Sequence, residues 1–197
     1  MLRYAPRLVP AGTAPPDALV ERVIEDPPQS PLGEHELVPV VAWMVERDGV
    51  FVHAPAADRA DLELMRGSAI LTMLGADLAH EALEGLPGVT FAATGPYAAE
   101  LLLDRDHLAG MHDILQAKVF LAGVPRRGRF LLGAVRGGIE GMRAFLAQVR
   151  REHDAAPLAD RISPVAMLVR DGAPTAVVGE LQLIALGQAA RPAPREQ

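Results

Sequence analysis

The amino-acid sequence predicts an α+β fold: an antiparallel or mixed β-sheet built from hairpins, with three to four helices packed on it. Two Asp-Gly pairs, Asp48-Gly49 and Asp171-Gly172, each separate two apolar runs. Both residues of such a pair tolerate positive φ, which is typical of hairpin turns. Segments with apolar residues at helical spacing lie between these hairpins. Tight antiparallel turns therefore outnumber crossover units, which favours this fold over a parallel nucleotide-binding fold.

The predicted strands are short apolar runs rich in β-branched residues. Hairpins are predicted to join residues 37–45 to 50–52, 165–169 to 175–178 and, through Gly95-Pro96, 89–94 to 97–103. Residues 130–135 are predicted to form a further strand. The third hairpin depends on a Gly-Pro turn, a weaker signal than Asp-Gly.

The predicted helices are identified by stripes of apolar residues three or four positions apart. They cover residues 17–25, 58–86, 106–116 and 138–152. Pro27-Pro28 is expected to end the first of them. The last is the clearest, because Ile139, Met142, Leu146 and Val149 lie on one face.

The 197 residues predict one α+β domain over 36–187, preceded by a proline-rich N-terminal arm (1–35) and followed by a disordered tail (188–197). Half of the residues are hydrophobic, enough for a sizeable core. The absence of cysteine excludes disulfides, a thiol nucleophile and cysteine-ligated metals. The N-terminus shows no secretory leader. The longest apolar stretch, 68–79, is too short for a bilayer and contains Asp77, so we expect a cytoplasmic protein with no membrane partner.

Charge is distributed unevenly along the chain. The net charge of −6 argues against nucleic acid as the main partner. Residues 117–151 nevertheless carry eight basic side chains and one acidic one, Glu140. We therefore predict an anion- or partner-binding set made of Arg126, Arg127, Arg129, Arg136, Arg143 and Arg150. The alternative is that these residues form a solvated helix face and a loop.

No known catalytic motif is present. None of the three serines, Ser30, Ser68 and Ser163, lies in a Gly-x-Ser-x-Gly elbow. Arg136 stands where a dinucleotide-binding motif needs glycine. An enzyme, a hydrolase or transferase, is the alternative function, with a site assembled from acidic and histidine residues that are dispersed in the sequence. These residues are Asp104, Asp106, His107 and His112. The two histidines are five residues apart and so on different helix faces, and no metal site or cofactor is predicted.

A further indication comes from the order of features after Asp77. A helix is expected to end in Ala82-Leu83-Glu84-Gly85-Leu86-Pro87. A Val-Pro step, Val124-Pro125, then leads into a strand, and Ile162-Ser163-Pro164-Val165 leads to Asp171-Gly172. In this order, residues 77–182 resemble the bacterial domain of unknown function 1444 family. The resemblance implies a cytoplasmic bacterial α+β protein and brings no activity with it.

The leading functional hypothesis is a non-enzymatic binding or protein-interaction domain. It is motivated by the missing catalytic motif and by several strands that leave a sheet edge available. The predicted partner is an acidic protein or a second copy of the chain.

Overall fold

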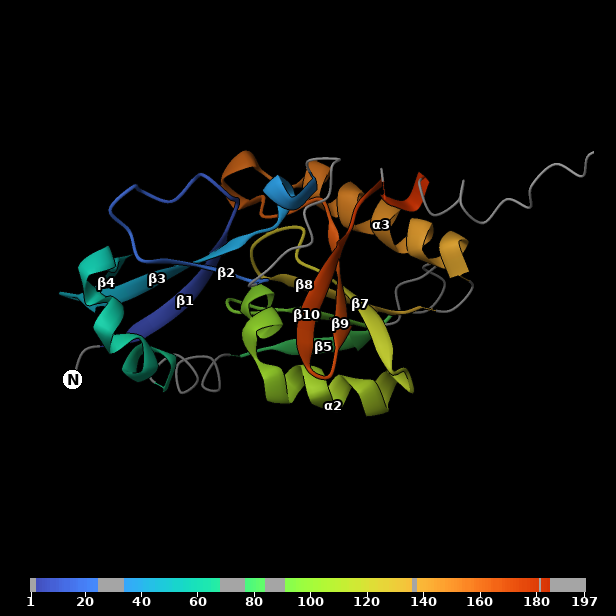
Figure 1. Cartoon of the computed structure of the whole chain (residues 1–197), viewed down its shortest axis with the longest axis horizontal. Coiled ribbons are helices and arrows are strands. Elements are labelled where there is room, and N and C mark those ends of the chain that lie inside the picture. Colours follow the sequence, from blue (N-terminus) through green and yellow to red (C-terminus); the bar gives the residue numbers. More distant parts are fainter. Residues whose placement is uncertain are drawn as a thin grey trace, which may run out of the picture.

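The α+β fold is confirmed in a computed structural model that describes residues 3–24, 34–67, 77–83, 91–135, 138–180 and 182–184. The strands form two sheets, one of four strands and one of six, and every pairing within them is antiparallel (Figure 1). The prediction of an antiparallel sheet is therefore correct in pairing, although the strands divide between two sheets.

The four-stranded sheet is centred on β3 (Val40–Arg47). Its neighbours are β1 (Tyr4–Val9) on one side and β2 (Val20–Arg22) and β4 (Val50–His53) on the other. The predicted hairpin between β3 and β4 is confirmed, with φ angles of 52° at Asp48 and 78° at Gly49. β1 and β2 come from the segment predicted as an N-terminal arm, so described parts of that segment pair with β3.

The predicted helix over 17–25 is wrong, because this segment contains β2 and an isolated bridge at Ala18. Leu19 donates its N–H to the Ala54 carbonyl and accepts from the Trp43 N–H. The apolar stripe of this segment therefore packs against β3 as extended chain. A short, β-branched run fits a strand as well as a helix, and the open edge of β3 decided between them.

The six-stranded sheet has the order β10-β9-β7-β8-β6-β5. Its strands are β5 (Ala79–Ala82), β6 (Phe91–Thr94), β7 (Val119–Gly123), β8 (Arg129–Ala134), β9 (Ala166–Arg170) and β10 (Ala173–Val178). The predicted hairpin at Asp171-Gly172 is confirmed, as is the strand predicted over 130–135. Positive φ angles of 50° and 72° at Asp171 and Gly172 again close the turn.

The two long helices lie on opposite faces of the six-stranded sheet (Figure 1). α2 (Arg105–Leu115) contributes to the larger core together with Phe120 and Phe130 from the sheet. α3 (Gly138–Ala155) packs through Phe145 on Leu121 and Leu131, on the other face. Neighbouring strand residues point to opposite faces, so each strand serves both cores. Both helices were predicted, within a few residues at each end.

Two further predictions are wrong. The single helix over 58–86 is replaced by a 3₁₀ helix, η2 (Ala56–Asp61), a helical segment over 62–67 and, after residues that are not described, the strand β5. The third predicted hairpin fails because residues 99–103 form a 3₁₀ helix, η3 (Ala99–Leu103), and β6 pairs with β5 and β8 instead. Leu101 and Leu102 of η3 enter the larger core.

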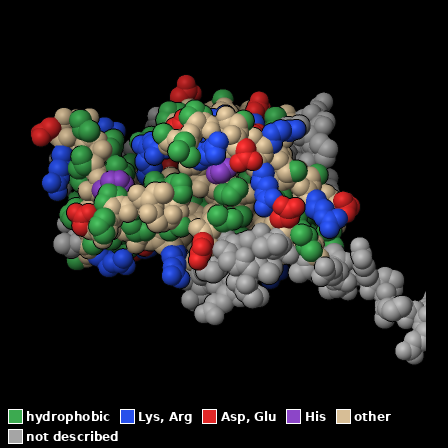
Figure 2. Space-filling view, turned by 90° about the horizontal axis from the view of Figure 1, so that it is seen from above, with side chains coloured by type: hydrophobic (Ala, Val, Ile, Leu, Met, Phe, Trp, Pro, Cys, Tyr) green, Lys and Arg blue, Asp and Glu red, His purple; other side chains and the backbone are tan. Residues whose placement is uncertain are grey.

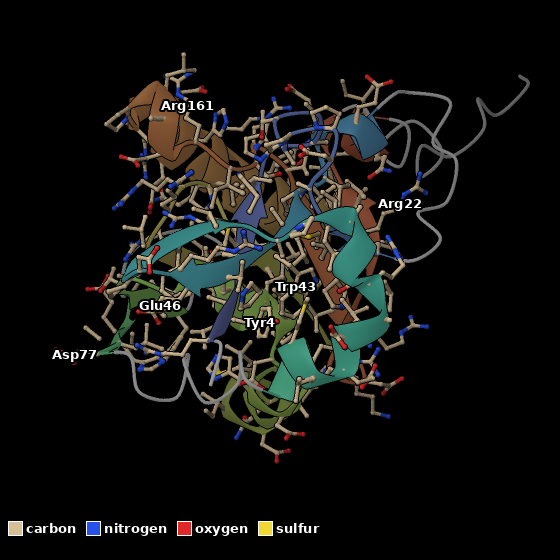
Figure 3. All side chains as sticks on the ribbon, turned by 90° about the vertical axis from the view of Figure 1, so that its left-hand side faces the viewer. Tyr4, Arg22, Trp43, Glu46, Asp77 and Arg161 are labelled. Atoms are coloured by element: carbon tan, nitrogen blue, oxygen red, sulfur yellow. The ribbon has the colours of Figure 1, made fainter. Side chains whose placement is uncertain are left out.

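The larger core also joins the two sheets, because it includes Tyr4, Leu8 and Trp43 from the four-stranded sheet. Figure 3 shows Tyr4 and Trp43 in the interior and Arg22 at the periphery. The indole N–H of Trp43 donates to Glu21 Oε2 at 2.7 Å. No helix in the described parts of the chain is long and apolar enough to cross a membrane. The predicted tail, 188–197, lies outside the described residues.

Candidate functional site

A hollow of about 450 Å³ lies where the two sheets meet. Its walls come from four regions that are far apart in the sequence. These are Arg7 of β1, the turn after β6 with the start of η3 (residues 95–97 and Glu100), residues 126–128 between β7 and β8, and Asp160 of η4 (Leu158–Asp160). The volume falls in the range of small-ligand sites, about 300–1,000 Å³. The hollow is therefore the candidate functional site.

Backbone hydrogen bonds hold the loop between β7 and β8 against the segment that follows α3. Arg127 donates its N–H to the Asp160 carbonyl at 2.8 Å, and the Ile162 N–H donates to the Pro125 carbonyl at 3.0 Å. On the other side, the Gly95 N–H donates to the Gly128 carbonyl at 3.2 Å. These bonds fix the backbone that carries Arg126 and Arg127 before any ligand binds.

The glycine at 128 is required by this close approach. Its φ is +67°, and a Cβ there would lie 2.9 Å from the Gly95 carbonyl oxygen. A side chain would therefore push the two walls of the hollow apart.

Three half-buried arginines, Arg7, Arg126 and Arg127, give the hollow its charge. Within the described part of the chain, no carboxylate lies within ion-pair distance of any of their guanidinium groups. Among the described residues, Arg126 Nη1 donates to one backbone carbonyl, that of Arg127, at 3.4 Å. Partly desolvated guanidinium groups without an anionic partner are available to a ligand.

Glu100 is an acidic residue in the wall of the hollow. Only 5% of its surface is exposed, so it is one of the most buried polar residues in the described part of the chain. Its Oε1 accepts the Leu8 N–H at 3.1 Å, which ties η3 to β1. Its Oε2 is buried and has no hydrogen-bond partner among the described residues. Burial raises the pKa of Glu100 above its ordinary value, although the bond from Leu8 and the charges of Arg7 and Arg127 act in the opposite direction.

The raised pKa predicts how Glu100→Gln changes stability. Because the folded form holds the proton more tightly than the unfolded form, this glutamate contributes stability at low pH that is lost as pH rises through its raised pKa. The glutamine can still accept from Leu8 and never ionises. Between the pKa of Glu100 in the unfolded protein and its raised pKa in the folded protein, the free energy of unfolding of Glu100→Gln should gain about 1.4 kcal/mol per pH unit over that of the parent protein.

Urea unfolding of both proteins across acid and neutral pH measures this gain. Glu63→Gln, at an exposed side chain, is the matched control and should show none of it. A constant difference between Glu100→Gln and the parent protein at all pH values would contradict the prediction.

Arg129, Arg143 and Arg150 of the predicted set are not part of the hollow. Arg129 is buried and bonds through Nε to Glu152 Oε2 at 2.9 Å and through Nη1 to Glu81 Oε1 at 2.8 Å. Burial lowers its pKa, but these carboxylates outweigh burial and raise the pKa of Arg129 above its usual range. The structure thus brings together Arg126 and Arg127 of the predicted set and directs Arg129 into an internal ion pair.

Arg143 and Arg150 of α3 also form ion pairs, with Glu140 and Glu180 respectively. Both pairs are partly exposed, and on the face seen in Figure 2 basic and acidic side chains are interspersed. Arg136 lies outside the described residues. Arg143 and Arg150 therefore carry local counter-ions, whereas Arg7, Arg126 and Arg127 have none among the described residues.

The acids and imidazoles of the alternative enzyme hypothesis do not meet at one point. Asp104 caps the N-terminus of α2 by accepting the His107 N–H at 2.9 Å, and Asp106 is exposed in the first turn. His112 accepts the Gly172 N–H at Nε2, so its proton is on Nδ1 and is donated to the Ala117 carbonyl. Both ring nitrogens are thus used in holding the fold.

His107 faces a different environment. Its ring lies 6.1 Å from that of His80 and 6.2 Å from that of Phe130, measured between centroids. Burial lowers the pKa of His107. Among the residues that the structure describes, no group of three or more histidine, aspartate and glutamate side chains is placed to hold a metal ion.

Sequence reasoning identified Arg126 and Arg127 of the site and missed Arg7 and Glu100. Arg7 is one of several scattered arginines in the N-terminal segment, and Glu100 lies in a segment whose sequence predicts a strand. Leu8 is 92 residues away from the glutamate that it bonds. Nothing local in the sequence marks either residue.

In comparisons with known proteins, no family model, no curated protein and no solved structure matches the chain. The resemblance to the domain of unknown function 1444 family stays a prediction.

Proposed function

We propose that this chain is a non-enzymatic binding protein whose hollow holds an oxyanion group, a phosphate or a carboxylate, of a small ligand. The observation that carries this proposal is the set of three half-buried arginines without carboxylate partners among the described residues. Their side chains come from β1 and from the loop between β7 and β8, so an anion held there contacts both sheets.

The chemistry of guanidinium groups supports an oxyanion. Each presents several N–H donors in a plane, which matches the paired oxygens of carboxylate and phosphate. A hydrogen bond to a charged group contributes about 1.5–3 kcal/mol, more than a neutral one. Loss of one arginine contact should therefore weaken binding by about tenfold or more.

The dimensions of the hollow favour a small ligand over an extended polyanion. Its basic residues are gathered around one concave volume of about 450 Å³, with Asp160 also in the wall. An extended nucleic acid would require basic residues along a surface. Arg143 and Arg150 of α3 lie outside the hollow and are paired with Glu140 and Glu180.

Titration with sulfate tests the proposal, since this ion is an oxyanion of fixed charge. The backbone amides of Gly95, Gly128 and their neighbours should shift in NMR spectra and saturate. Replacing Arg127 by alanine should raise the dissociation constant about tenfold. The double variant Arg126→Ala/Arg127→Ala should abolish saturation.

Arg143→Ala is the matched control, because it removes a helix arginine that already has a counter-ion. It should leave the sulfate affinity within about twofold of the parent value. Equal losses in the control and in Arg127→Ala would show that only general positive charge matters. No saturable shift around the hollow would disprove the proposal.

Phenyl phosphate and benzoate then identify the source of the oxyanion, because they share a ring and differ in the charged group. Preferential binding of one of them assigns the ligand class. The absence of binding by both would count against a ligand site in the hollow.

A further inference from the structure

The carboxyl group of Glu100 has a role in the hollow that the arginines alone do not explain. It lies in the wall of a site that we assign to anions, and its Oε2 has no hydrogen-bond partner among the described residues. A buried polar atom without a partner is costly, and most of all when it is charged, so the protonation of this carboxyl group is sensitive to a charge placed in the hollow.

The hydrogen bond from Leu8 determines where a proton on this carboxyl group resides. Oε1 accepts the Leu8 N–H at 3.1 Å, so it acts as the carbonyl-like oxygen. In the neutral form the proton is therefore on Oε2. The neutral side chain thus carries its proton on an atom that protein encloses, in a residue that lines the hollow.

The charges facing Glu100 explain why an anion would change its protonation. Arg7 of β1 and Arg127 of the loop before β8 both favour the ionised form, while burial disfavours it. Arg126 and Asp160 also line the hollow. An anion bound to the arginines neutralises the charges that favour the carboxylate and adds repulsion of its own. Proton uptake by Glu100 removes that repulsion.

We propose that Glu100 couples anion binding in the hollow to the uptake of one proton. The proton comes from solvent and resides on Oε2, where it removes the negative charge that would repel the bound oxyanion. This inference rests on the proposed function and adds its regulation: the same ligand binds more tightly at lower pH. The protonation of Glu100 then tunes the affinity of the hollow, because it sets the repulsion that an anion beside the arginines meets.

The alternative, in which an ionised Glu100 binds a cationic ligand, predicts a different pH dependence. If Glu100 stayed ionised and held a cationic ligand, affinity would rise with pH, and Arg7 and Arg127 would repel that ligand. The two arginines make this the less favourable arrangement, and its pH dependence has the opposite sign.

Sulfate titrations from about pH 5 to pH 9 test the coupling, because the charge of sulfate is constant over this range and proton linkage then reports on the protein alone. The dissociation constant of the parent protein should rise by up to about tenfold per pH unit above the pKa of Glu100 in the empty site. Glu100→Gln should remove that slope and keep the tight, low-pH affinity. Its amide stays neutral at every pH, while its carbonyl still accepts from Leu8.

Asp160→Asn is the matched control, because it neutralises the other carboxylate in the wall. It should raise the affinity for sulfate and keep the pH slope. Calorimetric titration of the parent protein in two buffers with different ionisation enthalpies measures proton uptake directly and requires no variant.

The outcomes separate the two proposals. Saturable sulfate binding without a pH slope, or with the same slope in Glu100→Gln, overturns the coupling and leaves the anion site standing. An affinity for sulfate that increases with pH also overturns it. The absence of sulfate binding at every pH overturns both the anion site and the coupling.

Discussion

Replacing Arg129 by methionine is expected to lower the free energy of unfolding by about 3 kcal/mol, since removing one partner of a buried ion pair leaves an uncompensated charge. The Arg129 side chain is 11% exposed, and that of Glu152 is 16% exposed. Arg129 starts β8 and joins it to β5 through Glu81 and to α3 through Glu152. Gln148 also donates to Glu152, at 2.9 Å, so one substitution disturbs a network across three elements.

Urea unfolding of Arg129→Met measures this loss, with Arg143→Met as the control. Arg143 also pairs with a glutamate, but the Glu140 side chain is 79% exposed. An exposed pair contributes about 0–1 kcal/mol, so the control should stay close to the parent protein. Adding Glu152→Gln to Arg129→Met should recover part of the loss, because it removes the uncompensated charge. Similar losses in Arg129→Met and Arg143→Met would contradict the prediction.

Replacing Gly95 by alanine should destabilise the protein by about 3 kcal/mol, from backbone strain and from a steric clash acting together. Its φ of +140° lies in a region that L-residues rarely adopt. A Cβ would lie 2.5 Å from the Asp77 carbonyl oxygen and 3.0 Å from Leu78 Cδ2. The first neighbour is backbone at the entry to β5, and it can move away only if that edge of the sheet shifts.

Gly110→Ala is the control for Gly95→Ala. Gly110 lies within α2, and a Cβ there would meet nothing within 4 Å. Alanine is favoured over glycine inside a helix by about 0.5–1 kcal/mol, so this variant should be more stable than the parent protein. Thermal and urea unfolding of both variants provide the comparison. A Gly95→Ala protein as stable as the parent would show that the β6–η3 turn can relax around a side chain.

Local patterns were sufficient to predict several elements. Each Asp-Gly turn places its two apolar runs within a few residues of each other, and both hairpins formed as predicted. The helices over 106–116 and 138–152 correspond to α2 and α3. In each case the interactions that determine the element lie within one helix or one turn, so a short window of sequence contains them.

The elements that were missed depend on distant partners. β2 is extended because β3 offers it an edge, and β5 pairs with β6 where the sequence predicted the end of a long helix. Short apolar runs without strong turn signals fit both conformations. Pairing between segments decides such cases, and a local window does not contain the partner.

The candidate site divides in the same way. The sequence by itself determined the two Asp-Gly hairpins, the two long helices and a basic segment that includes Arg126 and Arg127. Only the tertiary structure decided that Arg129 and the α3 arginines Arg143 and Arg150 have counter-ions among the described residues, whereas Arg126 and Arg127 have none. It also brought Arg7 to the same hollow and buried Glu100 beside it. Composition shows how many charged residues the chain has, but burial and ion pairing in the folded protein determine which of them can bind a ligand.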